Sequence, residues 1–293
     1  MFKDKKIGII PGILIVLFLV VFAGQFNRAS DEEAHTDLKL ADAHAIAVAL
    51  DDPQKLYIAN HGGVYALTED KLLTDVSQNR TDFMSFALHP SDPNIMFASG
   101  HPSSGGNLGL QKSVDGGDSW VEISTGLDGP VDFHTLAVDQ VDPDVIYGYF
   151  NGRLQRSTDG GVNWQYVDIP TKIIQLATGP DQDVVYATTS SGIIFSEDKG
   201  ETWNQLNTFK GVAISLAINP ENSDEMTIYS DVDELLMSSD RGQTWSPLSA
   251  PLDAERVFYM SYAKSDPATI YILTEKLRVF VSNDSGVSWQ QYN

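Results

Sequence analysis

SVDGGDSW, at residues 113–120, recurs in this chain as STDGGVNW (Ser157–Trp164), SEDKGETW (Ser196–Trp203), SSDRGQTW (Ser238–Trp245) and SNDSGVSW (Ser282–Trp289). The shared pattern is Ser-x-Asp-x-Gly-x-(Ser/Thr/Asn)-Trp, and successive copies start 44, 39, 42 and 44 residues apart. A period of this size is the sequence signature of a repeat architecture. The octapeptides therefore predict the overall fold before any single segment is read for secondary structure.

Each octapeptide has the chemistry of a tight turn, because Asp hydrogen-bonds nearby backbone N–H groups and Gly adopts positive φ. Strand-like apolar residues precede the copies, as in Ile193-Ile194-Phe195, and each copy ends on a Trp. We expect a hairpin turn whose exit is held by a large buried ring. We interpret as structural the residues Asp115, Trp120, Asp159, Trp164, Asp198, Trp203, Asp240, Trp245, Asp284 and Trp289.

A second pattern runs in phase with the octapeptides: a strand, a Pro/Asp turn and a strand that carries an aromatic residue. Leu136–Val138, Asp142-Pro143 and Val145–Tyr147 are one example. The same pattern near the start of the chain is followed by a turn, Thr68–Asp70, that lacks the Gly and the Trp, so we count six units with a degenerate first one. Their aromatic residues are Tyr57, Phe97, Tyr147, Tyr186, Tyr229 and Tyr271.

Each unit fits four short strands at about 8–12-residue spacing. Six four-stranded units in a ring make a six-bladed β-propeller, so the predicted fold class is all-β. The approximate blades are 43–77, 81–124, 131–168, 172–208, 212–249 and 256–293. Together they form one propeller domain over residues 43–293.

The octapeptides resemble Asp-box (BNR) repeats, which occur in sialidase-like propellers, the sortilin ectodomain and the photosystem II assembly-factor propellers. The chain is similar to small membrane-anchored bacterial BNR-repeat proteins that are often named glycosyl hydrolases. The resemblance covers nearly all of residues 43–293. It implies that the turns join the third and fourth strands of each blade, on the face away from the binding face, and it says little about activity.

Sialidase activity would need further residues, which the resemblance implies: an Arg triad, a Tyr/Glu nucleophile pair and an Asp acid. Arg80, Arg153 and Arg256 are placed to reach the binding face, and Tyr259 and Glu255 can be nominated, but the Arg-Ile-Pro motif is absent. For another glycosidase mechanism the sequence singles out no pair of carboxylates. We therefore favour a binding role and keep glycosyl hydrolysis as the alternative.

The N-terminus has the pattern of a membrane anchor. Lys3, Lys5 and Lys6 precede Ile7–Gly24, 18 residues without a charge. Such a run is just long enough to span a bilayer core of about 30 Å, and the lysines orient the N-terminus to the cytoplasm. We expect one N-terminal transmembrane helix, a signal anchor, at residues 1–24 and a stalk at residues 25–42. A cleaved signal peptide is the alternative, and both place the propeller outside the cytoplasmic membrane.

Composition limits the partners. A net charge of −21 repels nucleic acid, so we expect no nucleic-acid partner and instead an extracytoplasmic protein or glycan ligand. The chain contains no Cys, which excludes disulfides, thiol nucleophiles and cysteine metal sites.

Four of the six histidines fall on one face of the predicted propeller. The segments that lead into the inner strands, and those that join the second and third strands, open on the same face. His44 and His134 lead into inner strands, whereas His61 and His101 join second to third strands. These four histidines belong to three consecutive blades.

Two carboxylates, Asp82 and Asp132, also stand where the chain enters inner strands of blades 2 and 3. Imidazoles with nearby carboxylates are the ligand set for Zn²⁺, Cu²⁺ or non-haem iron. We therefore predict that the four histidines and two aspartates converge at the mouth of the central channel, as a site for a divalent transition metal or for acid–base chemistry. The alternative is a set of ordinary loop histidines, because the four share no short-range motif.

Overall fold

The computed structural model describes residues 42–293 except 78–79, 103 and 207. In this part of the chain the regular elements are all strands, arranged in six antiparallel sheets of four. The first three sheets contain β1 (Ala45–Val48), β2 (Leu56–Asn60), β3 (Gly63–Leu67), β4 (Leu73–Asp75); β5 (Asp82–Leu88), β6 (Met96–His101), β7 (Leu110–Ser113), β8 (Val121–Ser124); β9 (Thr135–Val138), β10 (Ile146–Phe150), β11 (Arg153–Ser157) and β12 (Gln165–Val167).

The other three sheets continue the same meander. They contain β13 (Ile173–Thr178), β14 (Val185–Thr189), β15 (Gly192–Ser196), β16 (Asn204–Leu206); β17 (Ala213–Ile218), β18 (Met226–Ser230), β19 (Glu234–Ser238), β20 (Ser246–Pro247); β21 (Val257–Ala263), β22 (Asp266–Thr274), β23 (Val279–Ser282) and β24 (Gln290–Gln291). None of the described residues belongs to a helix long and apolar enough to cross a membrane. The predicted anchor, residues 1–24, and all but the last residue of the predicted stalk lie outside the described residues.

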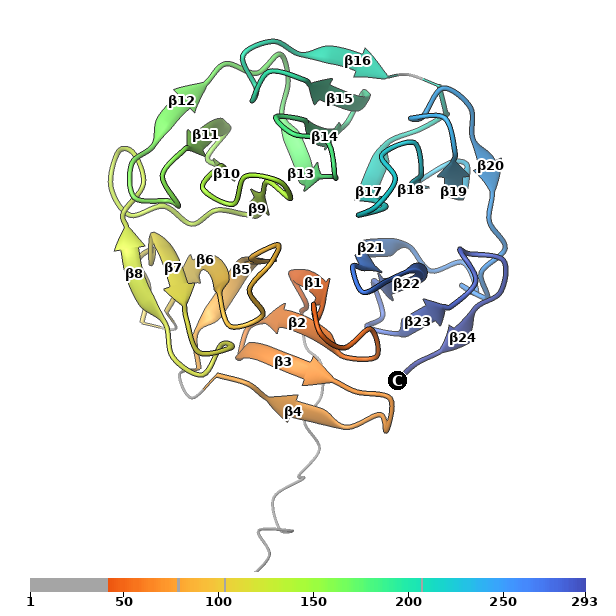
Figure 1. Ribbon diagram of the computed structural model, residues 1–293, viewed down its shortest axis with the longest axis horizontal. Coiled ribbons are helices and arrows are strands. Elements are labelled where there is room, and N and C mark those ends of the chain that lie inside the picture. Colours follow the sequence, from red (N-terminus) through yellow and green to blue (C-terminus); the bar gives the residue numbers. More distant parts are fainter. Residues whose placement is uncertain (1–41, 78–79, 103, 207) are drawn as a thin grey trace, which may run out of the picture. The chain divides into compact units, whose positions relative to one another are not determined.

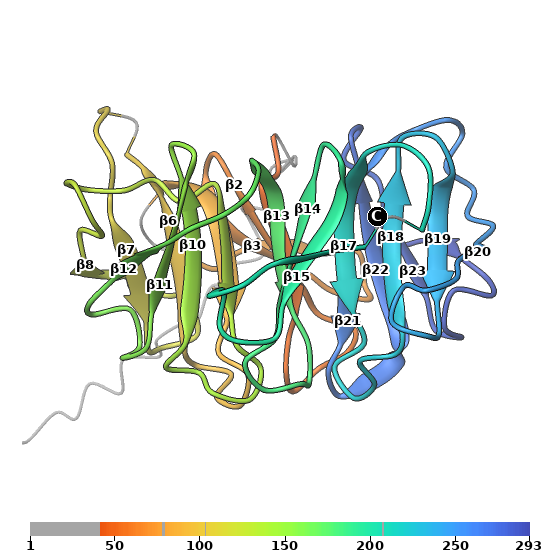
Figure 2. The same cartoon turned by 90° about the horizontal axis from the view of Figure 1, so that it is seen from above.

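The six sheets are arranged around a central axis, with the first strand of each sheet innermost (Figure 1). The inner strands contact one another in the order β1, β5, β9, β13, β17, β21 and back to β1, which closes the ring. Seen from the side, the sheets stand next to one another with connections above and below (Figure 2). The prediction of a six-bladed propeller with four-stranded blades is confirmed.

The hydrophobic core is divided into six clusters, one between each pair of neighbouring blades. In a typical interface, an aromatic residue of the second strand packs on the next blade, as Tyr147 of β10 packs with Leu176 and Val185 of blade 4. Tyr147 lies opposite the small Ala137 of the inner strand. Small residues at this position leave room for the six inner strands to converge on the axis.

Blade 5 departs from this pattern. Its register pairs Ala217 with Thr227, so Thr227, and not Tyr229 as expected from the sequence, stands at the aromatic position. Tyr262 of the neighbouring inner strand β21 fills the space, and its hydroxyl lies 2.6 Å from Thr227 Oγ1. At the interface between blades 5 and 6, the large side chain therefore comes from the inner strand of blade 6 and not from the second strand of blade 5.

Each octapeptide forms the turn between the third and fourth strands of its blade. In blade 4, Ser196 Oγ donates to Asp198 Oδ1 (2.7 Å), and Thr202 donates its N–H to Oδ1 (2.8 Å) and its hydroxyl to Oδ2 (2.6 Å). The other four copies repeat these bonds, with the side-chain amide of Asn163 in place of the hydroxyl in the second copy. The Asp carboxylate of each copy is thus used inside its own turn.

The Trp that ends each octapeptide packs at an interface between blades. Trp120, for example, packs against the cluster between blades 1 and 2, and its Nε1 donates to Ser77 Oγ at 2.7 Å. All five Trp rings are half-buried, not buried as predicted, because they stand next to the exposed outer strands. Blade 1, which lacks the octapeptide, closes its turn with backbone bonds from Thr68 to Leu72 and from Lys71 to Thr68.

Side chains, without any exchange of strands, join the last blade to the first. Val48 N–H of β1 donates to Ser261 Oγ of β21 at 3.3 Å, and Tyr271 Oη donates to Pro53 O at 3.0 Å. Tyr292 Oη also donates to Gln54 O. Blades 1 and 6 are each complete from their own contiguous sequence.

Candidate functional site

The four histidines predicted for the binding face come from three neighbouring blades. His44 directly precedes β1, and His61 lies in the two-residue connection from β2 to β3. His101 is the last residue of β6, and His134 directly precedes β9. In an antiparallel meander, the start of the first strand and the connection from the second to the third lie at the same end of the sheet. All four are therefore at the end of the blades opposite the octapeptide turns.

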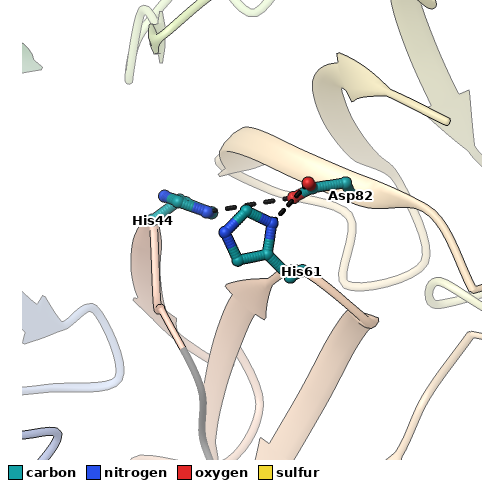
Figure 3. Close-up of side chains that lie close together, drawn as sticks. All are labelled: His44, His61 and Asp82. Carbon is teal, nitrogen blue, oxygen red and sulfur yellow. Dashed lines mark hydrogen bonds and ion pairs between the residues drawn. The ribbon is translucent and has the colours of Figure 1, made fainter. Parts of the chain in front are cut away.

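Asp82, the first residue of β5, is the centre of a cluster. His61 Nδ1 hydrogen-bonds Asp82 Oδ2, His44 Nε2 lies 3.8 Å from Oδ1, and His101 Nδ1 lies 3.6 Å from Oδ2. Figure 3 shows His44 and His61 directed at the same carboxylate. Three of the four predicted histidines thus lie around the carboxylate of one aspartate. We call His44, His61, His101 and Asp82 the His–Asp cluster.

Backbone pairing between β5 and β6 fixes the position of Asp82. The register places Asp82 opposite His101 and Phe83 opposite Gly100. A Cβ at Gly100 would lie 2.0 Å from the carbonyl oxygen of Asp82, so this close approach of the two backbones requires glycine. The Asp82 side chain is 11% exposed, and its position is therefore set by packing as well as by pairing.

His44 and His61 differ in how firmly they are held. The backbone N–H of His44 donates to Ala59 O at 2.8 Å, which extends the β1–β2 ladder by one residue, and the side chain is 15% exposed. The His61 side chain is 45% exposed and meets the His44 ring edge-on, with 4.7 Å between ring centroids. Its second nitrogen, Nε2, lies 3.6 Å from Asp42 Oδ2.

Burial is the main cause of a lowered pKa at His44. The neighbouring His61 lowers it further, while Asp82, Asp42 and Asp132 act in the opposite direction. Because an ordinary histidine titrates near pH 6.5, His44 is neutral at pH 7. A neutral imidazole has a lone pair, so His44 is in the form that accepts a hydrogen bond or binds a metal ion.

His134 forms an ion pair with Asp132, a carboxylate that also acts electrostatically on His44. His134 Nε2 lies 3.4 Å from Asp132 Oδ2, and the hydrogen bond that the imidazole donates to this carboxylate raises the pKa of His134. The prediction placed these two residues in one cluster with the other histidines, whereas the structure pairs His134 with Asp132 and not with Asp82. The reason is that Asp132 is only two residues before His134 in the sequence, so the two side chains form an ion pair within blade 3.

The inner strands enclose a channel of about 460 Å³, with His44 and His134 on its wall. Four inner strands begin with a β-bulge whose extra residue is apolar. Met84 of blade 2 is not among the residues that line the channel, and the other three, in blades 4–6, are Ile174, Ile214 and Phe258. All three side chains line the channel, and Ile174 and Phe258 are 43% and 39% exposed. Bulges often redirect a side chain next to a binding site. The mouth is thus apolar on one half and carries histidines on the other.

Carboxylates are absent from the described residues that line the channel. Glu255 stands two residues before the inner strand β21, and its carboxylate is bonded by Arg278 at 2.9 Å and by Thr274 at 2.7 Å. Burial raises the pKa of Glu255, but bonds from Arg278, Thr274 and Lys276 outweigh burial and lower it to about 2. Burial raises the pKa of Tyr259 to about 12. Neither residue is suited to act as a catalytic acid or nucleophile at neutral pH.

Sequence reasoning missed the apolar half of the mouth. The available signal was a pair of consecutive apolar residues at the start of an inner strand, as in Ile173-Ile174 and Val257-Phe258, which breaks the alternation expected of a strand. Such a pair marks the bulge, but only the pairing register shows which of the two side chains faces the channel.

Comparison with known proteins supports the fold. No family model matches the chain. The xyloglucanase of Hypocrea jecorina (strain QM6a) is 24% identical over 178 residues, which cover 49% of this chain and 20% of that protein. The chain thus spans about one fifth of the length of this curated relative.

Solved structures resemble the propeller at low sequence identity. The structure of YCF48 bound to D1 peptide is 16% identical, with a TM-score of 0.57, and the match covers 86% of this chain and 82% of that one. The GH74 enzyme of Niastella koreensis (15%, TM-score 0.58) and the GH74 xyloglucanase of Xanthomonas campestris (14%, 0.57) match 85% and 84% of this chain but only 46% and 45% of theirs. At these identities the likeness shows the propeller fold.

Proposed function

We propose that this protein is a binding propeller, anchored in the cytoplasmic membrane by residues 1–24, whose extracytoplasmic domain holds a segment of a partner protein at the channel mouth. The observation that carries the proposal is the apolar half-ring made by Ile174, Ile214 and Phe258 around a channel of about 460 Å³. A cavity of this volume that combines apolar side chains with polar groups is large enough to bind a ligand.

The chemistry of the mouth favours a peptide over a glycan. Two of the three bulge residues, Ile174 and Ile214, are aliphatic and offer a surface for an apolar side chain of a partner, whereas a sugar ring would be expected on a platform of several exposed aromatic faces, and Phe258 is the one aromatic ring of the three. Gln175 and His134 on the channel wall can hydrogen-bond a peptide backbone. YCF48, which has a similar fold and length, was solved with a bound peptide, and this also supports a peptide ligand. The likeness of the octapeptides to Asp-box repeats is consistent with this role.

Two observations count against the alternative, glycosyl hydrolysis. Most glycosidases need two carboxylates about 5–9.5 Å apart beside the scissile bond. The described residues that line the channel include none, and Glu255 is bonded to Arg278. The chain also matches less than half of each GH74 structure.

The test uses the purified full-length protein and a display library of short peptides. We expect enrichment of peptides with an apolar anchor residue, and loss of their binding in the variants Ile174→Asp and Phe258→Asp. The matched control is Val162→Asp, since Val162 is exposed to a similar degree but lies in an octapeptide turn on the opposite face. Binding that survives both mouth variants would refute the proposal, as would hydrolysis of xyloglucan by the wild-type protein.

The membrane anchor has its own test. An alkaline phosphatase fused after Asn293 is expected to be active only if the propeller lies outside the cytoplasm, and the fusion should stay in carbonate-washed membranes. An inactive fusion contradicts the orientation, and release of the protein into the medium contradicts the anchor.

A further inference from the structure

We propose that His44, His61 and Asp82 together bind one divalent transition-metal ion, with His101 positioning the carboxylate. One possible ligand atom from each of the three residues lies within 4.8 Å of the others. The site belongs to blades 1 and 2, away from the apolar half of the channel mouth, and the inference does not depend on the ligand proposed there.

The distance between His44 Nε2 and Asp82 Oδ1 is already close to the distance between two ligand atoms of one metal ion. Donor atoms around a tetrahedral Zn²⁺, each about 2.0–2.2 Å from the metal, are roughly 3.3–3.5 Å apart. His44 Nε2 and Asp82 Oδ1 are 3.8 Å apart, and both side chains are held by packing. His61, the third member, is nearly half exposed, and its Nδ1 already hydrogen-bonds the Asp82 carboxylate, so it would complete the set by exchanging that bond for the metal ion.

Two polar atoms without hydrogen-bond partners also support a metal ion between His44 and Asp82. His44 Nε2 and Asp82 Oδ1 are both buried, and neither has a hydrogen-bond partner. A buried polar atom without a partner is unfavourable, so native structures seldom keep two side by side. A metal ion between them would be bound by both lone pairs at once.

The surroundings also resemble the outer layer of a metal site, in which ligands are oriented by further hydrogen bonds. If His61 binds through Nδ1, its other nitrogen lies 3.6 Å from Asp42 Oδ2, slightly beyond a hydrogen bond, and the carboxylate is thus placed on the side from which imidazole ligands are oriented. His101 Nδ1 lies 3.6 Å from Asp82 Oδ2 and steadies the second carboxylate oxygen. His101 is therefore a positioning residue in this site.

The donor set indicates which metals fit. Two imidazoles and one carboxylate suit Zn²⁺, Cu²⁺, Ni²⁺ or Fe²⁺, whereas Ca²⁺ and Mg²⁺ prefer sites made of oxygen atoms. Three protein ligands leave at least one coordination position open for water or another group. We therefore assign the site to a transition metal and use Zn²⁺ as the probe.

Calorimetric titration of the full-length protein with Zn²⁺ tests the assignment. The protein carries a purification tag without histidines and is first treated with a chelator and dialysed. We expect one Zn²⁺ per chain in the wild type and at least a ~10-fold loss of affinity in His61→Gln and in Asp82→Asn. His101→Gln should weaken binding less than either. Excess Ca²⁺ should not displace the Zn²⁺.

The matched control is His134→Gln, which removes another His–Asp pair from the same face and should bind Zn²⁺ like the wild type. Thermal unfolding of each variant shows whether it is folded. If Asp82→Asn does not fold, His61→Gln decides, because the His61 side chain is nearly half exposed and its replacement is less disruptive. The assignment is overturned if the wild type shows no saturable binding, if His61→Gln binds as tightly as the wild type, if His134→Gln loses as much affinity, or if Ca²⁺ displaces Zn²⁺.

Discussion

His134 shows how a single residue makes the stability of this propeller depend on pH. The hydrogen bond to Asp132 raises the pKa of His134 in the folded protein, although burial opposes the effect. Folding therefore favours the protonated imidazole. Its stabilisation is fully present below the unfolded value of about 6.5 and is lost as the pH rises through the higher folded value.

We predict that His134→Gln lowers the urea midpoint at about pH 5 and has a smaller effect at about pH 9. The effect should be modest, because the His134 side chain is 61% exposed. His89→Gln is a control of opposite sign. Burial lowers the pKa of His89, and its Nδ1 accepts the N–H groups of Ser91 and Asp92, so its contribution should be larger at high pH. A His134 effect that grows with pH would contradict the assignment.

At the scale of strands, the interface between blades 5 and 6 differs from the others in which strand supplies the large side chain. In the other five blades the second strand supplies an aromatic residue, but blade 5 supplies Thr227, and Tyr262 reaches across from β21. Valine occupies the position equivalent to Tyr262 in blades 1 and 3, as Val48 and Val138. The two positions therefore compensate each other.

A double-mutant cycle measures this compensation. Tyr262→Val should lower the free energy of unfolding by about 3 kcal/mol through a cavity, and Thr227→Tyr by about 1–3 kcal/mol through overpacking. The double variant restores the arrangement of the other blades, so its loss should be smaller than the sum by at least about 1 kcal/mol. Denaturant unfolding of the four proteins gives the coupling energy, and purely additive losses would show that the two positions do not share one space.

Strand order and strand register explain which features of the fold and of the site could be predicted from the sequence and which could not. The octapeptide period and its turn residues predicted six four-stranded blades, and strand order alone placed His44, His61 and His101 at one end of them. The pair Val257-Phe258 marks a bulge, but which of its two side chains faces the channel, and the true register of Tyr229, were not predictable, because both depend on how neighbouring strands pair and not on local preference. The separation of His134 from Asp82 depended on side-chain positions in three dimensions, which strand order does not specify.

At the scale of the whole molecule, the last residues contribute to closing the ring. Tyr292 is buried, and its ring centroid lies 5.0 Å from that of Tyr271. Its hydroxyl donates to Gln54 O of blade 1. Blades 1 and 6 share no strand, so these side chains and the cluster around them hold the seam.

We predict that Tyr292→Ala lowers the free energy of unfolding by about 3 kcal/mol, whereas Tyr292→Phe, which loses only the hydrogen bond, lowers it by about 1 kcal/mol. Tyr166→Ala is the control. Tyr166 is 39% exposed on the outer strand β12, and its loss should change stability by less than about 1 kcal/mol. Chemical denaturation of the three variants provides the values, and equal losses at Tyr292 and Tyr166 would show that the seam is not held by Tyr292.

The seam also determines the order in which a newly made chain can finish folding. Each sheet is built from a contiguous segment, whereas the hydrogen bonds across the seam join residues 213, 218 and 238 apart in the sequence. Contacts between distant residues form late, because closing a long loop is entropically unfavourable. During synthesis we therefore expect an open arc of docked blades that leaves the apolar side of blade 1 uncovered. The time until blade 6 docks is the interval in which proteases and other nascent chains can reach that surface.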